Sequence, residues 1–164
     1  MTAISDVKNR VLEMLTEGLG LQVKLRPENE VLVELSDAST AVFIHFAAQE
    51  FEAEEIEDQV FVNVSAPLLR GLTLTPELYR WVATEGTAHD MGCVQLHEID
   101  EDDGSQSGLL RFTYTLLGDY IDEGELETAL WAVLFTADRL DDELQAQFGG
   151  RRWIDADPGD EANL

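Results

Sequence analysis

The chain has 164 residues, of which 34 are Asp or Glu and 10 are Lys or Arg, giving a formal net charge of −24 at pH 7. Such a charge repels phosphate backbones and anionic headgroups, so we expect neither nucleic acid nor a membrane as a partner. Hydrophobic residues make up 45% of the chain, which excludes a disordered protein, and the length suits one domain with a single core.

The first half of the chain is predicted to form a helix followed by a meander of strands. Apolar residues recur at helical spacing over residues 4–18, and Gly18 and Gly20 end the pattern. Short β-prone runs follow at 21–26, 31–35 and 41–48, separated by turn-forming residues. The acidic stretch 50–58 is predicted to be a charged turn before a strand over 60–66.

The second half is predicted to contain two more helices and a hairpin. Thr75 is a good N-cap ahead of Pro76, which predicts a short helix over 76–85. The alternating runs 93–99 and 109–117 flank a polar loop and predict a β-hairpin. Asp122 and Glu125 have capping-box spacing, and the apolar stripe after them predicts the longest helix, ending at Gly149.

The order of these elements, α-β-β-β(-β)-α-β-β-α, predicts an α+β fold in which the helices pack on one face of an antiparallel sheet. We assign residues 1–150 to a single domain. Residues 151–164 are acidic and almost lack apolar side chains, so we expect a disordered tail. The single cysteine, Cys93, cannot form an internal disulfide, and no apolar leader opens the chain, so we expect a cytoplasmic location.

No arrangement of side chains in the sequence indicates catalysis, a cofactor or a metal ion. Cys93 begins a predicted strand, where a half-buried thiol usually has a structural role. His45, His89 and His97 lie in separate elements and match no metal-binding spacing. The acidic run 100–104 resembles a calcium loop but places apolar residues at the first and last ligand positions. We therefore expect no enzyme activity, no cofactor and no metal site.

A partner-binding surface is predicted on the face of the sheet that the helices leave uncovered. The run 41–46 is apolar on both sides, so turning one side to the core leaves aromatic and polar residues facing outward. An arginine on this face would be able to receive a carboxylate. The same phasing in the neighbouring strands gives the candidate residues Phe43, His45, Phe61, Asn63, Arg111 and Thr113. The alternative is that the long last helix covers this face.

Three short segments, together with the order of elements, resemble the bacterial YbjN-like family. The segments are Ala66–Gly71 ahead of Thr75–Leu78, and Leu116–Asp119 ahead of the last helix, and the resemblance covers residues 4–150. That family is similar in fold to the CesT-type chaperones of type III secretion, acidic proteins that commonly dimerise and hold extended client segments. The resemblance implies a non-enzymatic, peptide-binding module that acts as a chaperone or adaptor. It also implies that the chain can form a homodimer. An acidic decoy or regulator of a basic protein partner is the alternative.

Overall fold

The structure is a computed structural model that describes residues 3–35, 37–49 and 59–155. The order of its elements confirms the predicted α+β fold, whereas the predicted turn at 50–58 lies outside the described residues. In chain order the elements are α1 (Ile4–Glu13), the π-helical turn η1 (Met14–Gly18), β1 (Val23–Arg26), β2 (Glu30–Val33), β3 (Val42–Gln49), β4 (Gln59–Leu72), α2 (Pro76–Thr84), β5 (Cys93–Asp100), β6 (Gln106–Leu117), α3 (Glu123–Phe148) and the 3-10 turn η2 (Trp153–Asp155).

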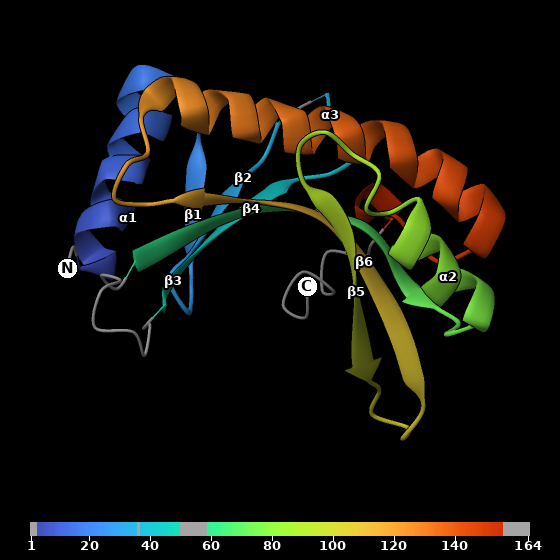
Figure 1. The fold of residues 1–164 in the computed structure, drawn as a ribbon. Coiled ribbons are helices and arrows are strands. Elements are labelled where there is room, and N and C mark those ends of the chain that lie inside the picture. The colour runs from blue at the N-terminus through green and yellow to red at the C-terminus, as the bar shows by residue number, and fades with distance from the viewer. Residues whose placement is uncertain (1–2, 36, 50–58, 156–164) are drawn as a thin grey trace.

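The strands of the described residues form one six-stranded antiparallel sheet in the order β1-β2-β3-β4-β6-β5. Figure 1 shows α3 lying along one side of this sheet, with α1 and α2 near its two ends. Alternate residues of the central strands point to that side and are almost fully buried, as the phasing predicts, among them Val42, Ile44, Phe46, Val62, Val64, Leu110 and Phe112. The opposite side, which we call the open face, carries the other residues of each strand.

The first helix ends earlier than its apolar spacing predicts. Val7, Val11 and Leu15 are fully buried on one side of it, as a 3.6-residue period requires. From Met14 the backbone widens into the π-helical turn η1, closed by the Leu19 N–H donating to the Met14 carbonyl at 2.8 Å. Gly20, with φ +66°, then turns the chain toward β1.

The two later helices begin where the sequence predicts. The Leu78 N–H donates to the Thr75 hydroxyl oxygen at 3.2 Å, which caps α2. The Glu125 N–H donates to the Asp122 carboxylate at 2.8 Å, which caps α3. Within the described residues, no helix combines the length and the apolar composition needed to cross a bilayer.

Residues 151–155 return to the sheet, so the predicted domain boundary at residue 150 lies too early. Arg151 forms an antiparallel bridge with Arg70 through two backbone hydrogen bonds of 2.9 Å. Trp153 packs edge-on against Phe43, with ring centroids 5.4 Å apart. An aromatic ring in an otherwise polar segment therefore provides the apolar contact that a disordered tail lacks. Residues 156–164 lie outside the described part of the chain.

Candidate functional site

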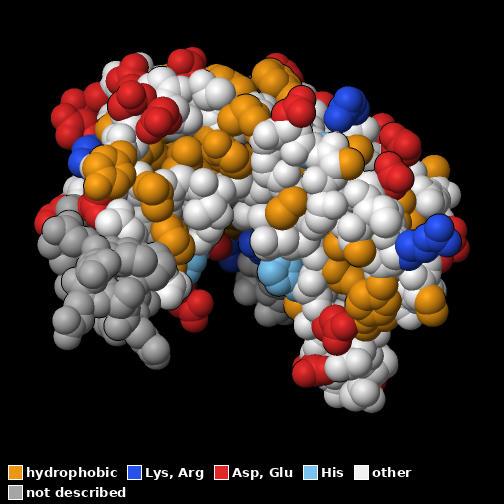
Figure 2. Space-filling view, viewed as in Figure 1, with side chains coloured by type: hydrophobic (Ala, Val, Ile, Leu, Met, Phe, Trp, Pro, Cys, Tyr) orange, Lys and Arg blue, Asp and Glu red, His pale blue; other side chains and the backbone are white. Residues whose placement is uncertain are grey.

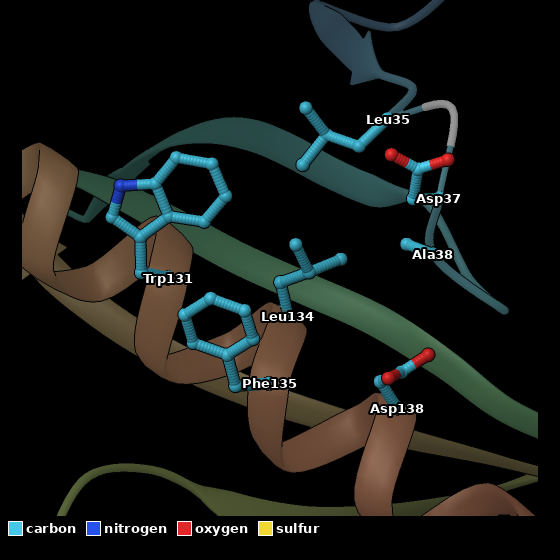
Figure 3. Close-up of a pocket in the computed structure, with 7 residues that line it drawn as sticks. All are labelled: Leu35, Asp37, Ala38, Trp131, Leu134, Phe135 and Asp138. Carbon is cyan, nitrogen blue, oxygen red and sulfur yellow. The ribbon is translucent and has the colours of Figure 1, made fainter.

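A groove opens between the middle of α3 and the segment that joins β2 to β3. Its cavity has a volume of about 260 Å³. Figure 3 shows side chains from the two elements facing each other across it, with the aromatic rings at one end and two carboxylates at the other. The lining residues, which define the α3 groove, are Leu35, Asp37, Ala38, Trp131, Leu134, Phe135 and Asp138.

The sequence of α3 explains why two aromatic rings remain at the surface. The stripe that faces the sheet is aliphatic and includes Leu126, Leu130, Val133, Ala137 and Leu144. Trp131 and Phe135 lie four residues apart on the flank of that stripe, so their side chains are neighbours. The rings stack with centroids 5.6 Å apart and an interplanar angle of 18°, and Phe135 stays 64% exposed. Exposed aromatic surface beside a cavity is typical of a contact site.

The other end of the groove is negatively charged. Asp138 accepts hydrogen bonds from the backbone N–H of Ser39 at 2.9 Å and from the Ser39 hydroxyl at 2.6 Å. These hydrogen bonds stabilise the ionised carboxylate and lower the pKa of Asp138. Asp37 is exposed on the opposite wall. The groove therefore combines an apolar surface with an acidic end.

A buried carboxyl group holds the same wall in place. Asp141 is 1% exposed, and its Oδ2 lies 2.6 Å from the Ser39 hydroxyl oxygen. The Ser39 hydroxyl has one proton and lies 2.6 Å from an oxygen of both Asp138 and Asp141, so both contacts are hydrogen bonds only when one of the two carboxyl groups is protonated. Burial raises the pKa of Asp141 in the direction that favours its protonated form. The hydrogen-bonded series Asp141, Ser39, Asp138 thus connects α3 to the groove wall.

Strand pairing places the six candidate residues of the sequence analysis on the open face, because antiparallel partners point the same way. Figure 2 shows that the molecule is hollowed on its underside, with His and Lys or Arg side chains in the hollow. Rows that cross the sheet on this face are Phe43, Ser65 and Thr113; His45, Asn63 and Thr115; and Ala47, Phe61 and Leu117.

Phe43 is not an exposed contact residue, contrary to the prediction. It is fully buried beneath Trp153, and the guanidinium carbons of Arg26 and Arg111 lie 5.3 and 5.4 Å from its ring centroid. Thr113 is also buried, at 8% exposure. The covering element is η2, not α3 as the alternative supposed. Phe43 therefore belongs to a small second core on the open face, together with Leu32, Ala41 and Trp153.

The remaining candidates keep part of their surface on the open face. His45, Phe61, Asn63 and Arg111 are half-buried. The Asn63 side-chain oxygen accepts a hydrogen bond from the Thr115 hydroxyl at 2.7 Å, which fixes its orientation. Across the described ranges, no group of His, Cys, Asp or Glu side chains is arranged to hold a metal ion.

Sequence reasoning missed the residues that shape both surfaces. Trp131 and Phe135 carry a usable signal, because an aromatic pair at helical spacing beside an aliphatic stripe marks a second apolar face. Trp153 also carries a signal, since a tryptophan in a polar segment needs a partner. The position of Ser39 against α3 has no such signal, because it depends on a contact between distant parts of the chain.

The comparisons with known proteins agree with this architecture. A search of curated proteins finds no match to the chain. One protein-family model matches residues 5–156, which is nearly the whole chain. That family is described as T3SS (YopN, CesT) and YbjN peptide-binding chaperone 1. It is a family of non-enzymatic proteins, and its partners are proteins or peptides. The chain therefore belongs to the TY-Chap1 family of peptide-binding chaperones.

Proposed function

We propose that this chaperone holds a client segment in the α3 groove, with an apolar client side chain against Trp131 and Phe135. The observation that carries the proposal is the stacked ring pair, of which Phe135 is 64% exposed and Trp131 half-buried, beside a cavity of about 260 Å³. Aromatic residues in such positions supply most of the binding energy at many interfaces, since they bury a large rigid surface. The volume suits one aliphatic or aromatic side chain with its flanking backbone.

The acidic end of the groove favours a client with a lysine or arginine close to that apolar residue. Asp37 and Asp138 lie together at this end (Figure 3), and hydrogen bonds from Ser39 keep Asp138 ionised. The net charge of −24 speeds encounter with basic segments. The expected client motif is therefore an apolar residue followed or preceded by a basic one.

The test uses an array of short synthetic peptides probed with the intact chain and with Phe135→Ser. We expect binding to peptides with the apolar and basic pair, and a roughly 30-fold loss of affinity for Phe135→Ser, the size of loss typical of a central aromatic contact. Tyr120→Ser is the matched control, because Tyr120 is 72% exposed and lies outside the groove. Equal peptide affinity of Phe135→Ser and Tyr120→Ser would show that the groove is not the binding site.

An acidic decoy or regulator of a basic partner remains a second candidate, supported by the ratio of 34 acidic to 10 basic residues. Its binding would depend on total charge and would fall steeply with added salt. Groove binding would keep much of its affinity in high salt, because burial of apolar surface does not weaken there. Repeating the peptide titration at low and high ionic strength separates the two functions.

A homodimer is the competing occupant of the same exposed rings. The proposal predicts that Phe135→Ser leaves the oligomeric state unchanged, which sedimentation of the full chain measures. Conversion of a dimer to a monomer by Phe135→Ser would assign the groove to self-association instead.

We place the activity in the cytoplasm, where a free thiol such as Cys93 stays reduced.

A further inference from the structure

Arg111 on the open face is a half-buried cation that shares one nearby anion, Glu30, with Arg26. Its guanidinium carbon lies 5.4 Å from the centroid of the Phe43 ring. Throughout the described part of the chain, the Arg111 guanidinium makes no hydrogen bond and no ion pair. Its neighbour on the same ring, Arg26, differs in this respect, because Glu30 lies 3.3 Å from the Arg26 Nε.

Contact with an aromatic ring does not satisfy the hydrogen-bond donors of this guanidinium. A cation–π contact contributes about 0.5–2 kcal/mol, but it uses none of the five N–H donors of an arginine. Burial lowers the pKa of Arg111, and the positive charge of Arg26 acts in the same direction, against the effect of Glu30. A partly buried cation of this kind destabilises the folded protein unless an anion pairs with it.

Two basic side chains, Arg26 and Arg111, lie beside one ring on a strongly negative protein, with Glu30 as a nearby anion. Lys and Arg account for 10 of 164 residues, yet the guanidinium carbons of two arginines lie 5.3 and 5.4 Å from the centroid of the Phe43 ring. His97, on the neighbouring strand β5, is close enough for the charge of Arg111 to contribute to its lowered pKa, which burial dominates. Figure 2 shows His and Lys or Arg side chains in the hollow on the underside of the molecule.

We propose that Arg111 binds the side-chain carboxylate of an Asp or Glu in an extended peptide that lies on the open face beside Trp153. An arginine fork matches a carboxylate with two parallel hydrogen bonds, which satisfies donors that Phe43 cannot. The proposal deepens the peptide-binding function by naming the chemistry of a second contact, on the opposite side of the sheet from the α3 groove.

The proposed source of the carboxylate is a separate client peptide, and the acidic residues at the C-terminal end of the chain are the competing source. Trp153 and Arg152 line a small cavity together with Pro67, the register partner of Arg111, and with Leu109. Trp153 and Arg111 both contact the Phe43 ring, and Asp157, Asp160 and Glu161 follow Trp153 in the sequence. A tethered segment has a high effective concentration, so it would compete with the carboxylate of a separate client.

The probe is a synthetic peptide with the sequence of residues 155–164, acetylated and amidated, and a counterpart in which Asn and Gln replace every Asp and Glu. Each is titrated into the full-length protein and into a full-length variant carrying Asp157→Asn, Asp160→Asn and Glu161→Gln. The readout is the NMR signal of the Arg111 Nε–Hε group at physiological ionic strength, where long-range repulsion is screened.

We expect the acidic peptide, and not the neutral one, to shift the Arg111 signal. Equal binding to both proteins supports a separate client as the source, and binding to the neutralised variant alone assigns Arg111 to the chain's own acidic residues instead. Arg111→Gln in the neutralised variant should weaken binding about 10- to 100-fold, the loss expected for hydrogen bonds to a charged group. Arg80→Gln, an exposed arginine on α2, is the control with the same charge change.

Three results would overturn the assignment: no peptide binding to either protein, equal binding of the acidic and neutral peptides, or undiminished binding to Arg111→Gln. Circular dichroism verifies that Arg111→Gln folds. The outcome is independent of the groove, because peptide capture through Phe135 should be unchanged in Arg111→Gln. A failure here therefore leaves the proposed function standing, and a failure of the groove leaves this site standing.

Discussion

The α3 groove and the open face use aromatic residues in opposite ways. On the open face, Phe43 points away from the main core, yet Trp153 and two arginines cover it completely. On the helical side, Phe135 borders the main core and remains 64% exposed. The direction of a side chain is set by the local period of its strand or helix, whereas its exposure is set by what the rest of the chain places over it.

The sharpest way to break this comparison is to make the same substitution at both phenylalanines. Phe43→Ser should lower the free energy of unfolding by about 3–5 kcal/mol, because it removes a fully buried ring. Phe135→Ser should change it by less than about 1 kcal/mol, because the ring is mostly in solvent already. Urea denaturation followed by circular dichroism measures both values. Similar losses at the two positions would mean that the groove rings are structural.

A second prediction concerns the cover over Phe43. Trp153→Ala should lower the free energy of unfolding by about 2 kcal/mol, less than a fully buried tryptophan, because Trp153 is itself half-buried. The adjacent Ile154 provides the control, since it is 60% exposed and Ile154→Ala should change stability by about 0.5 kcal/mol or less. If both substitutions are neutral in the same denaturation experiment, η2 does not stabilise the open face.

The smallest expected effect concerns the wall of the groove and depends on pH. The folded pKa of Asp141 is raised from its usual value of 3.8, so its stabilising contribution is complete below that value and is lost as pH rises through the folded pKa. Asp141→Asn keeps a donor for Ser39 at every pH. The substitution should therefore raise the free energy of unfolding by roughly 1 kcal/mol at pH 7 and by less at pH 4.

Asp138 belongs to the same hydrogen-bonded series, but the pH dependence of its contribution to stability has the opposite sign. Its folded pKa is lowered, so its contribution is present above the usual value of 3.8 and is lost as pH falls through the folded pKa. Asp138→Asn should therefore destabilise the protein at pH 7, where Asp141→Asn stabilises it. Thermal unfolding of both variants across pH 4 to 7, run beside the parent, checks the pair. Parallel pH profiles would contradict the proton assignment on Asp141.

The fold was predictable because most of its elements carry local signals. Thr75 and Asp122 are helix caps in the sequence and in the structure. The alternation in β3, β4 and β6 correctly identifies the core side of each strand. The predicted strand over 60–66 is shorter than β4, which continues to Leu72 with register shifts after Pro67, because a proline cannot donate a ladder hydrogen bond.

The candidate site was less predictable, because both surfaces depend on contacts between distant parts of the chain. The α3 groove exists where Ser39 hydrogen-bonds to α3, and no local pattern around Ser39 indicates that contact. Phe43 was assigned to the correct side of the sheet, but its burial depends on Trp153 at the far end of the chain. Sequence periodicity predicts faces, and it does not predict which faces are later covered.

The backbone bridge between Arg70 and Arg151 determines how short a working form of this chaperone can be. A gene truncated after residue 150 would delete the bridge and Trp153 together, which removes the aromatic cover of the Phe43 ring and leaves two backbone groups of β4 without their protein partners. A recombinant form intended for crystallisation or for fusion to a reporter should therefore keep the natural sequence through at least Asp155. Any appended tag belongs beyond that point, where it would not displace η2 from the sheet.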